Sequence, residues 1–270
     1  EGPMRPTPHL GACPHLTRVL AALGAVWGRT RLMRLSGHAE VIGHVDVNYY
    51  WRERVRLHVP IVTQPTVRFI CGDAELNMAP GEAWIFDTWR PHRVINDAEH
   101  ARIHLVADTV GSAAFWELVR AGRPHDRREG WSPRPAAVEG PLPPLAFETL
   151  NSPTVMTPWE LRSHLDFLLA EAQPDPAMLR PVAEACSRFV AAWHGLWSQY
   201  GDAEAGWPAY YAASQDFTAT LQRMRAQRIL LTNGVRFFDQ VVLMLLKTAL
   251  SGRARRAVES AAGAAPDAAA

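Results

Sequence analysis

Two histidines and one aspartate have the residue types and spacing of a metal site. His44 and Asp46 stand two positions apart in the segment GHVDVNYYWRERVRL, which begins at Gly43. If this segment begins as a β-strand, both side chains project from one face, because successive side chains of a strand alternate. His92 begins a later β-like segment, and a jelly roll can bring it beside the first pair. Two histidines and one carboxylate with open coordination positions suit a non-haem Fe(II) centre.

Two arginines stand in segments that otherwise read as half-buried strands. Arg56 and His58 are two positions apart, and Arg102 alternates with apolar residues. A buried arginine is costly unless a carboxylate pairs with it. A dicarboxylate ligand would supply that partner through the bidentate geometry that guanidinium groups prefer. The alternative partners are acids of the chain itself, namely Glu53, Asp87 and Asp108.

Short β-like segments separated by turn residues must position these side chains. They are Arg31–Leu35, Ala39–His44, Arg54–Thr63, Val67–Cys71, Ala83–Asp87, His92–Asn96 and Ala101–Ala107. Ser36-Gly37, Gly72-Asp73 and Pro80-Gly81 supply the turns. Many short strands at this spacing are typical of a sandwich or barrel of the jelly-roll kind. We expect this core over residues 31–112, with residues 1–30 as an N-terminal lead-in.

The remainder of the chain changes from proline-rich to helical. For residues 113–156 we expect a helix and then a proline-rich linker or wrapping loop, since residues 122–158 hold eight of the 21 prolines. Residues 157–260 are expected to be helical, beginning at the capping box Thr157-Pro158-Trp159-Glu160. Further helices are predicted over Asp175–Tyr200, Ser214–Thr232 and Val235–Leu250. Residues 261–270 are expected to form a disordered tail.

Composition limits the classes of partner. The 270 residues include 28 basic and 27 acidic ones, a net charge of +1, which argues against nucleic acid or an anionic membrane as the main partner. The three cysteines form no CxxC motif, which is typical of the reducing cytoplasm. No apolar run approaches the roughly 20 residues of a membrane helix. We expect a soluble, cytoplasmic protein that acts on a small molecule or peptide, and the oligomeric state stays open.

Three motifs in order carry a family resemblance. HVDVNYYWRERVRLHVPI, GEAWIFDTWRPHRVIN and ARIHLVAD together resemble the aspartyl/asparaginyl β-hydroxylases, a family of Fe(II)- and 2-oxoglutarate-dependent dioxygenases whose relatives include proline cis-4-hydroxylase. The resemblance implies a double-stranded β-helix core and iron ligation by His44, Asp46 and His92. It also implies that Arg56, His58 and Arg102 bind the co-substrate 2-oxoglutarate, with O2 as the second co-substrate.

The expected activity is hydroxylation of an unactivated C–H bond in an amino acid or peptidyl residue, with 2-oxoglutarate decarboxylated to succinate and CO2. Desaturation, cyclisation or epoxidation at the same iron centre is one alternative, and a non-catalytic jelly-roll binding module is another. His104 shares a strand face with Arg102 and is an alternative metal ligand. Candidate substrate contacts flank the ligand positions: Asn48, Tyr50, Arg52, Trp89, Arg90 and Arg93.

Overall fold

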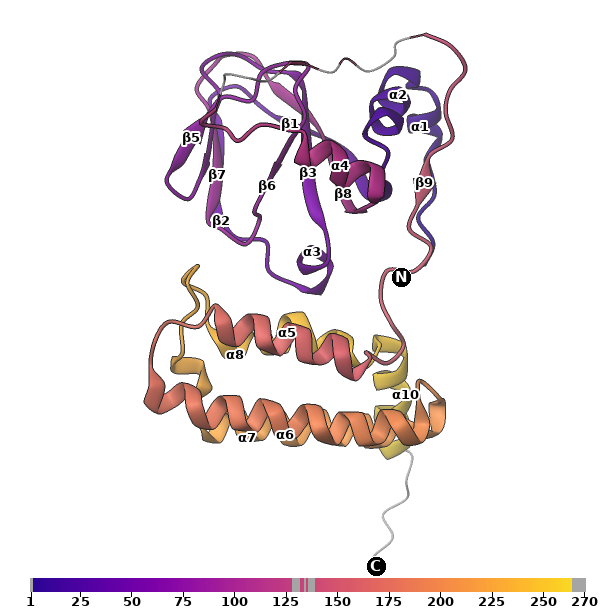
Figure 1. Ribbon diagram of the computed structural model, residues 1–270, viewed down its shortest axis with the longest axis vertical. Coiled ribbons are helices and arrows are strands. Elements are labelled where there is room, and N and C mark those ends of the chain that lie inside the picture. Colours follow the sequence, from indigo (N-terminus) through magenta and orange to yellow (C-terminus); the bar gives the residue numbers. More distant parts are fainter. Residues whose placement is uncertain (1, 128–131, 134, 136–138, 264–270) are drawn as a thin grey trace, which may run out of the picture. The chain divides into compact units, whose positions relative to one another are not determined.

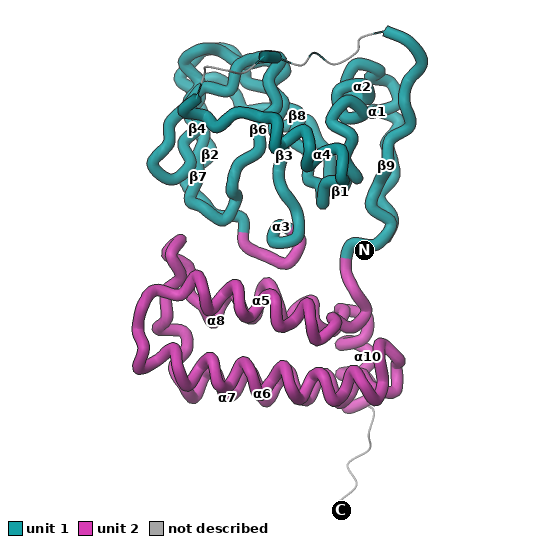
Figure 2. The backbone as a smooth tube through the Cα atoms, viewed as in Figure 1, with its two compact units in different colours: residues 1–46, 51–151 teal, residues 47–50, 152–270 magenta. Residues whose placement is uncertain are grey.

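The computed structural model describes residues 2–127, 132–133, 135 and 139–263. The chain forms two compact units, coloured separately in Figure 2. The first comprises residues 1–46 and 51–151, and the second comprises residues 47–50 and 152–270. The first unit holds the β-strands and the second is helical (Figure 1). Among the described residues, no helix combines the length and the apolar character needed to cross a membrane.

Two sheets make up the first unit. In the described part of the chain, the larger has the strand order β6-β3-β8-β1-β9 and the smaller has the order β2-β7-β4-β5. Neighbouring strands pair antiparallel except β1 and β9, which pair parallel. The bounds are β1 Val26–Leu35, β2 Ala39–His44, β3 Val55–Val62, β4 Arg68–Cys71, β5 Ala74–Leu76, β6 Trp84–Phe86, β7 His92–Asn96, β8 Arg102–Gly111 and β9 Ala146–Phe147.

Strand alternation gives the larger sheet one apolar face and one polar face. On β3 and β8, Leu57, Val59, Leu105 and Ala107 join an apolar core with helices α1 (Pro8–Gly11), α2 (Pro14–Leu23) and α4 (Ala113–Arg120). Five of the alternate positions on these strands carry buried polar side chains: Arg56, His58, Arg102, His104 and Asp108. Because alternate side chains point to opposite faces, these groups lie on the face away from the helices.

The polar face of the larger sheet is turned toward the smaller sheet. Phe69 of β4 contacts Phe86 of β6, with ring centroids 4.7 Å apart. A second apolar cluster, centred on Val67, Phe69, Met78 and Val94, also joins strands of both sheets. The two mainly antiparallel sheets that enclose this interior, together with the helical C-terminal part, confirm the predicted double-stranded β-helix with a helical region.

The second unit consists of helices and short helical turns. Thr157 caps α5, since its hydroxyl accepts a hydrogen bond from the Glu160 backbone at 3.2 Å, as the capping box predicts. Trp193 is fully buried and donates from its indole to the Met156 carbonyl at 2.8 Å. The elements are α5 Pro158–Ala170, α6 Pro176–Tyr200, η1 Glu204–Gly206, α7 Trp207–Arg223, η2 Ala226–Arg228, α8 Phe237–Gln240, η3 Val241–Leu246, α9 Lys247–Ala249 and α10 Gly252–Gly263. A short helix, α3 (Tyr49–Arg52), follows the Asp46 segment.

Some predicted element bounds were wrong. The helix predicted over Ser214–Thr232 begins at Trp207, where a proline occupies its first turn, and it ends before Arg225, whose φ of 56° is left-handed. The helix predicted over Val235–Leu250 is divided into α8, a π-helical turn over Val241–Leu246 and α9. The strands β5 and β9, of three and two residues, lie outside the predicted β segments. Of the predicted tail 261–270, residues 264–270 lie outside the described part, as do residues 128–131, 134 and 136–138 of the proline-rich segment.

Candidate metal centre and the interior around it

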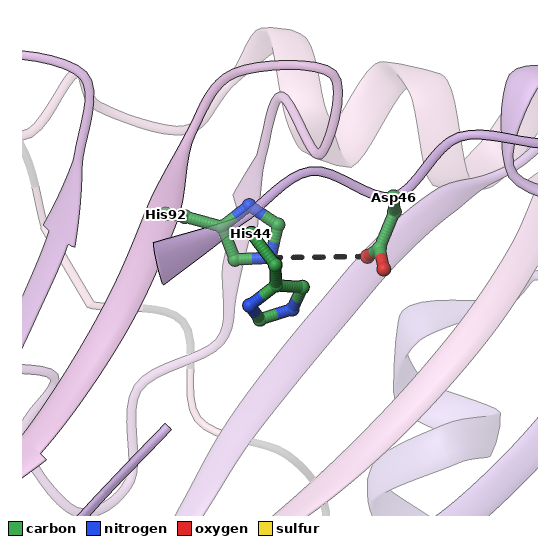
Figure 3. Close-up of side chains that lie close together, drawn as sticks. All are labelled: His44, Asp46 and His92. Carbon is green, nitrogen blue, oxygen red and sulfur yellow. Dashed lines mark ion pairs between the residues drawn. The ribbon is translucent and has the colours of Figure 1, made fainter. Parts of the chain in front are cut away.

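The strand pair β2–β7 brings the two predicted metal-binding histidines together. His44, the last residue of β2, is the cross-strand partner of His92, the first residue of β7, so the pairing of these strands joins residues 48 positions apart in the sequence. Their ring centroids are 4.3 Å apart. His44, Asp46 and His92 each offer one ligand atom, and these atoms lie within 4.8 Å of one another (Figure 3). The predicted triad is therefore assembled, whereas His104 is not part of this group.

Backbone hydrogen bonds fix the tautomer of both histidines. His44 Nδ1 lies 2.8 Å from the Ile42 carbonyl oxygen, and His92 Nδ1 lies 2.9 Å from the Arg90 carbonyl oxygen. A carbonyl can only accept, so each Nδ1 carries the proton and each Nε2 keeps its lone pair. Hydrogen bonding of the outer ring nitrogen is the usual arrangement of metal-binding histidines. Both rings are therefore prepared to ligate through Nε2.

Asp46 is held by contacts with both its backbone and its carboxylate. Its backbone N–H donates to the Thr88 carbonyl at 3.0 Å, which places it beside the β6–β7 connection. Its Oδ2 lies 3.8 Å from His92 Nε2 and accepts a hydrogen bond from Arg56 Nη1 at 2.7 Å. Burial lowers the pKa of His92, and the nearby His44 lowers it further. His92 is thus neutral near pH 7, as a metal ligand must be.

Arg56 connects Asp46 with a second buried carboxylate. Its Nε and Nη2 donate to the two oxygens of Asp108 at 2.8 and 3.3 Å, and these two residues are cross-strand partners on β3 and β8. The Asp108 side chain is fully buried, and it also lies 3.7 Å from Arg31 Nη1. Trp51 stacks near the guanidinium of Arg56, 5.2 Å from ring centroid to Cζ. The alternative partner weighed for Arg56, an internal acid, is therefore realised, and the contact of Arg56 with 2-oxoglutarate stays a prediction.

Arg102 is buried, and no carboxylate of the described residues pairs with it. Its Nη2 lies 2.7 Å from His104 Nδ1 and 3.4 Å from His58 Nδ1, and its Nε has no partner among the described residues. Burial lowers the pKa of Arg102 to about 10, so the guanidinium still carries its charge near pH 7. Burial and then Arg102 lower the pKa of His58 well below its usual value. Within the described part of the chain, this cation is accompanied by neutral imidazoles only.

Aromatic rings connect the region of Arg102 with the metal centre. The His58 ring contacts Phe86 at 5.3 Å between centroids, and Phe86 contacts His92 at 5.0 Å. His58 and Phe86 are on the larger sheet, and His92 is on the smaller one. One interior between the sheets therefore holds a candidate metal site and a positive charge that no carboxylate in the described part of the chain compensates.

The predicted substrate contacts are spread over the two units. Asn48 and Tyr50 belong to the helical unit by their contacts, whereas Arg52, Trp89 and Arg90 belong to the β unit. Arg90 is exposed and pairs with Asp87 at 3.6 Å, and Arg93 is also exposed. A role in substrate binding stays a prediction for all of them.

Two interior residues received no firm role from the sequence. The sequence offers Asp108 as one of several possible partners for arginine and His104 only as an alternative metal ligand. The signal that places both on the same strand face as Arg102 is the period of two along β8, which puts positions 102, 104 and 108 on one face. The partner of Asp108, Arg56, depends on the β3–β8 register, which joins residues about 50 positions apart and has no local signature.

Comparison with known proteins agrees with the resemblance seen in the sequence. Residues 4–111, less than half of the chain, match the family described as aspartyl/asparaginyl β-hydroxylase, which confirms that resemblance. The matched range contains the metal triad and Arg102. Among curated proteins, none matches the chain.

Solved structures similar to parts of the chain include cupins. A cupin-superfamily sugar phosphate isomerase from Silicibacter pomeroyi is 20% identical, with 30% of this chain and 48% of that chain covered and a TM-score of 0.24. A predicted oxalate decarboxylase from Thermotoga maritima is 12% identical, with 30% of this chain and 64% of that chain covered and a TM-score of 0.25. A cupin 2 conserved barrel protein from Salinispora arenicola is 8% identical, with 34% of this chain and 71% of that chain covered and a TM-score of 0.25. The chain thus covers less than two thirds of the first two, and the fold assignment rests on the sheets and their register.

Proposed function

Because residues 4–111 match the aspartyl/asparaginyl β-hydroxylase family, we propose that the protein is an Fe(II)- and 2-oxoglutarate-dependent dioxygenase that hydroxylates an amino acid or a peptidyl residue. One observation supports this most strongly. The same interior holds a His-Asp-His ligand group and a buried arginine with no carboxylate partner among the described residues. A dicarboxylate that chelates a metal ion would bind at the His-Asp-His group with one end and compensate the charge of the arginine with the other.

The donor set fits Fe(II). His44 and His92 would ligate through Nε2 and Asp46 through a carboxylate oxygen, which leaves positions for other ligands. When bound, the iron supplies oxidation of an unactivated C–H bond by O2, coupled to conversion of 2-oxoglutarate into succinate and CO2. Arg56 holds Asp46 Oδ2 from one side, so the carboxylate keeps one orientation toward the two histidines.

Arg102 is proposed to bind the carboxylate of 2-oxoglutarate that is remote from the metal. A buried guanidinium without an anion is strongly unfavourable, and a bound carboxylate compensates its charge with paired hydrogen bonds. His58 accepts from Arg102 through Nδ1, so its Nε2 carries a proton and can donate to the same co-substrate. The low pKa of His58, caused mainly by burial, keeps this donor neutral.

The residues beside the metal ligands suggest the substrate class. Trp89 and Arg90 lie between Thr88, which contacts Asp46, and the ligand His92. Asn48, Tyr50 and Arg52 follow Asp46 in the chain. Arginines beside the metal ligands suit the carboxylate of a free amino acid or of an acidic side chain. Fold and cofactor do not fix the substrate.

Turnover tests this function. The protein with Fe(II) and 2-oxoglutarate is incubated with a panel of amino acids and acidic peptides, and succinate and substrate-derived products are measured by mass spectrometry. We expect O2-dependent succinate and a product heavier than its substrate by one oxygen atom, both lost in His92→Ala. A product that has lost two hydrogen atoms would indicate desaturation or cyclisation at the same centre. Absence of succinate under all conditions would favour a binding module.

A further inference from the structure

His104 is a buried polar side chain that the roles above leave unused. It lies two residues after Arg102 on β8 and is 1% exposed. The residues opposite it in the two neighbouring strands are Met33 and Pro60, neither of which has a polar side-chain partner to offer. A buried polar group without a partner is costly, so its presence calls for an explanation.

The contact with Arg102 determines the tautomer of His104. Arg102 Nη2 lies 2.7 Å from His104 Nδ1, and a guanidinium can only donate. Nδ1 therefore accepts, and in the neutral ring the proton is on Nε2. That Nε2 is buried and has no hydrogen-bond partner in the described part of the chain. His104 thus holds an unused N–H donor in the interior between the sheets.

Neutrality of this ring is favoured by its surroundings. Burial, and then the charge of Arg102, lower the pKa of His104 to about 3. The groups that face it are cationic or neutral: Arg102 on its own strand and His58 on β3, whose ring meets it edge-on at 5.6 Å. A neutral imidazole donates one hydrogen bond without adding a second charge beside Arg102.

Two unused donors lie on residues that contact each other. Arg102 Nε, like His104 Nε2, is buried without a partner in the described residues. Because Nδ1 of His104 contacts Arg102, the Nε2–H points away from the guanidinium, and one carboxylate group does not reach both donors. 2-Oxoglutarate carries two carboxylates and a keto oxygen, so this single anion offers acceptors to both residues.

We infer that His104 is a further co-substrate-binding residue, whose Nε2–H donates to an oxygen of the same 2-oxoglutarate molecule that Arg102 pairs with. This rests on the proposed function, since 2-oxoglutarate is the anion concerned. The competing explanation is that His104 acts only through Nδ1, as an acceptor that orients Arg102.

Two substitutions separate these explanations. The side-chain amide of asparagine reaches the place of Nδ1, so His104→Asn keeps an acceptor for Arg102 and loses the Nε2–H donor. Glutamine reaches the place of Nε2, so His104→Gln keeps that donor and loses the Nδ1 acceptor. His100→Asn, an exposed histidine four residues earlier, is the matched control. The measured quantity is the dissociation constant of 2-oxoglutarate from the Mn(II)-loaded protein, by calorimetry, with Mn(II) affinity and thermal unfolding recorded for each variant.

We expect His104→Asn to weaken 2-oxoglutarate binding about 10- to 100-fold, as for loss of a hydrogen bond to a charged group. His104→Gln should bind more tightly than His104→Asn, and Mn(II) affinity should be unchanged in both. If His104→Asn binds as tightly as His104→Gln or more tightly, direct contact through Nε2 is overturned. If the wild-type protein binds Mn(II) but no 2-oxoglutarate, the proposed function itself fails.

Discussion

Replacing Asp108 with asparagine is expected to destabilise the β unit and weaken the metal site together. The Asp108 side chain is fully buried and receives Arg56 Nε at 2.8 Å and Nη2 at 3.3 Å. The amide keeps the volume and one acceptor, but it removes the negative charge and places an N–H against a guanidinium donor. Breaking a buried ion pair costs about 3–5 kcal/mol, and we expect about 3 kcal/mol here because Arg56 keeps Asp46.

The metal site is affected through Arg56. Without Asp108, the guanidinium turns toward Asp46 and competes with the metal for Oδ2. Loss of a group that orients a metal ligand lowers affinity typically 10- to 100-fold. Stability would be measured by urea unfolding followed by circular dichroism, and affinity by calorimetric titration with Mn(II).

Asp97→Asn provides the matched control. Asp97 pairs with Arg68 at a similar distance of 2.8 Å, but both side chains are about half exposed. Exposed pairs contribute about 0–1 kcal/mol, so this variant should lose no more than that and keep its Mn(II) affinity. Equal losses of stability in the two variants, or unchanged Mn(II) affinity in Asp108→Asn, would refute the reasoning.

Three further predictions concern the metal ligand His92, the buried ring of His104 and the close approach of the backbone at Gly37. His92→Ala should abolish tight Mn(II) binding, whereas Cys71→Ser, its cross-strand neighbour on β4, should retain it in the same titration. The pKa of His104 is about 3 in the folded protein and about 6.5 in the unfolded chain. Between these pH values the unfolded chain binds a proton that the folded protein does not bind. The free energy of unfolding therefore falls as the pH drops below about 6.5. When urea unfolding is measured at pH 7 and at pH 5, His104→Asn should lose less of its free energy of unfolding between the two pH values than the wild-type protein does. Equal losses would contradict a buried, neutral ring. A Cβ at Gly37 would lie 2.0 Å from the Glu99 carbonyl oxygen, whereas one at Gly43 meets nothing within 4 Å; Gly37→Ala should therefore lower the melting temperature and Gly43→Ala should leave it nearly unchanged.

The sequence predicted those features that have a local signature. The bounds of β2 and β7 follow from alternating side chains and turn residues, and Thr157 marks the start of α5. The His-x-Asp spacing predicted a shared site because two ligands two positions apart need only one strand. Assembly with His92 required the β2–β7 register, which the resemblance to a known family supplied.

Non-local pairings were not predictable in the same way. The partner of Arg56 is decided by the β3–β8 register, and several acids were equally compatible with the sequence. The predicted helix over Ser214–Thr232 lies too far toward the C-terminus. The observed helix starts at Trp207-Pro208, where a proline in the first turn is the start signal. The function of His104 emerges only when its Nδ1 contact shows which nitrogen is left unpaired.

Anaerobic addition of Fe(II) and then 2-oxoglutarate tests the central claim most directly. Chelation of the co-substrate by iron at His44, Asp46 and His92 should produce a weak visible charge-transfer band, which saturates with 2-oxoglutarate. Arg102→Met, which removes the buried cation but keeps the volume of the side chain, should require a much higher 2-oxoglutarate concentration to reach the same band. A wild-type protein that binds Fe(II) without developing this band would contradict the assignment of the interior as a 2-oxoglutarate site.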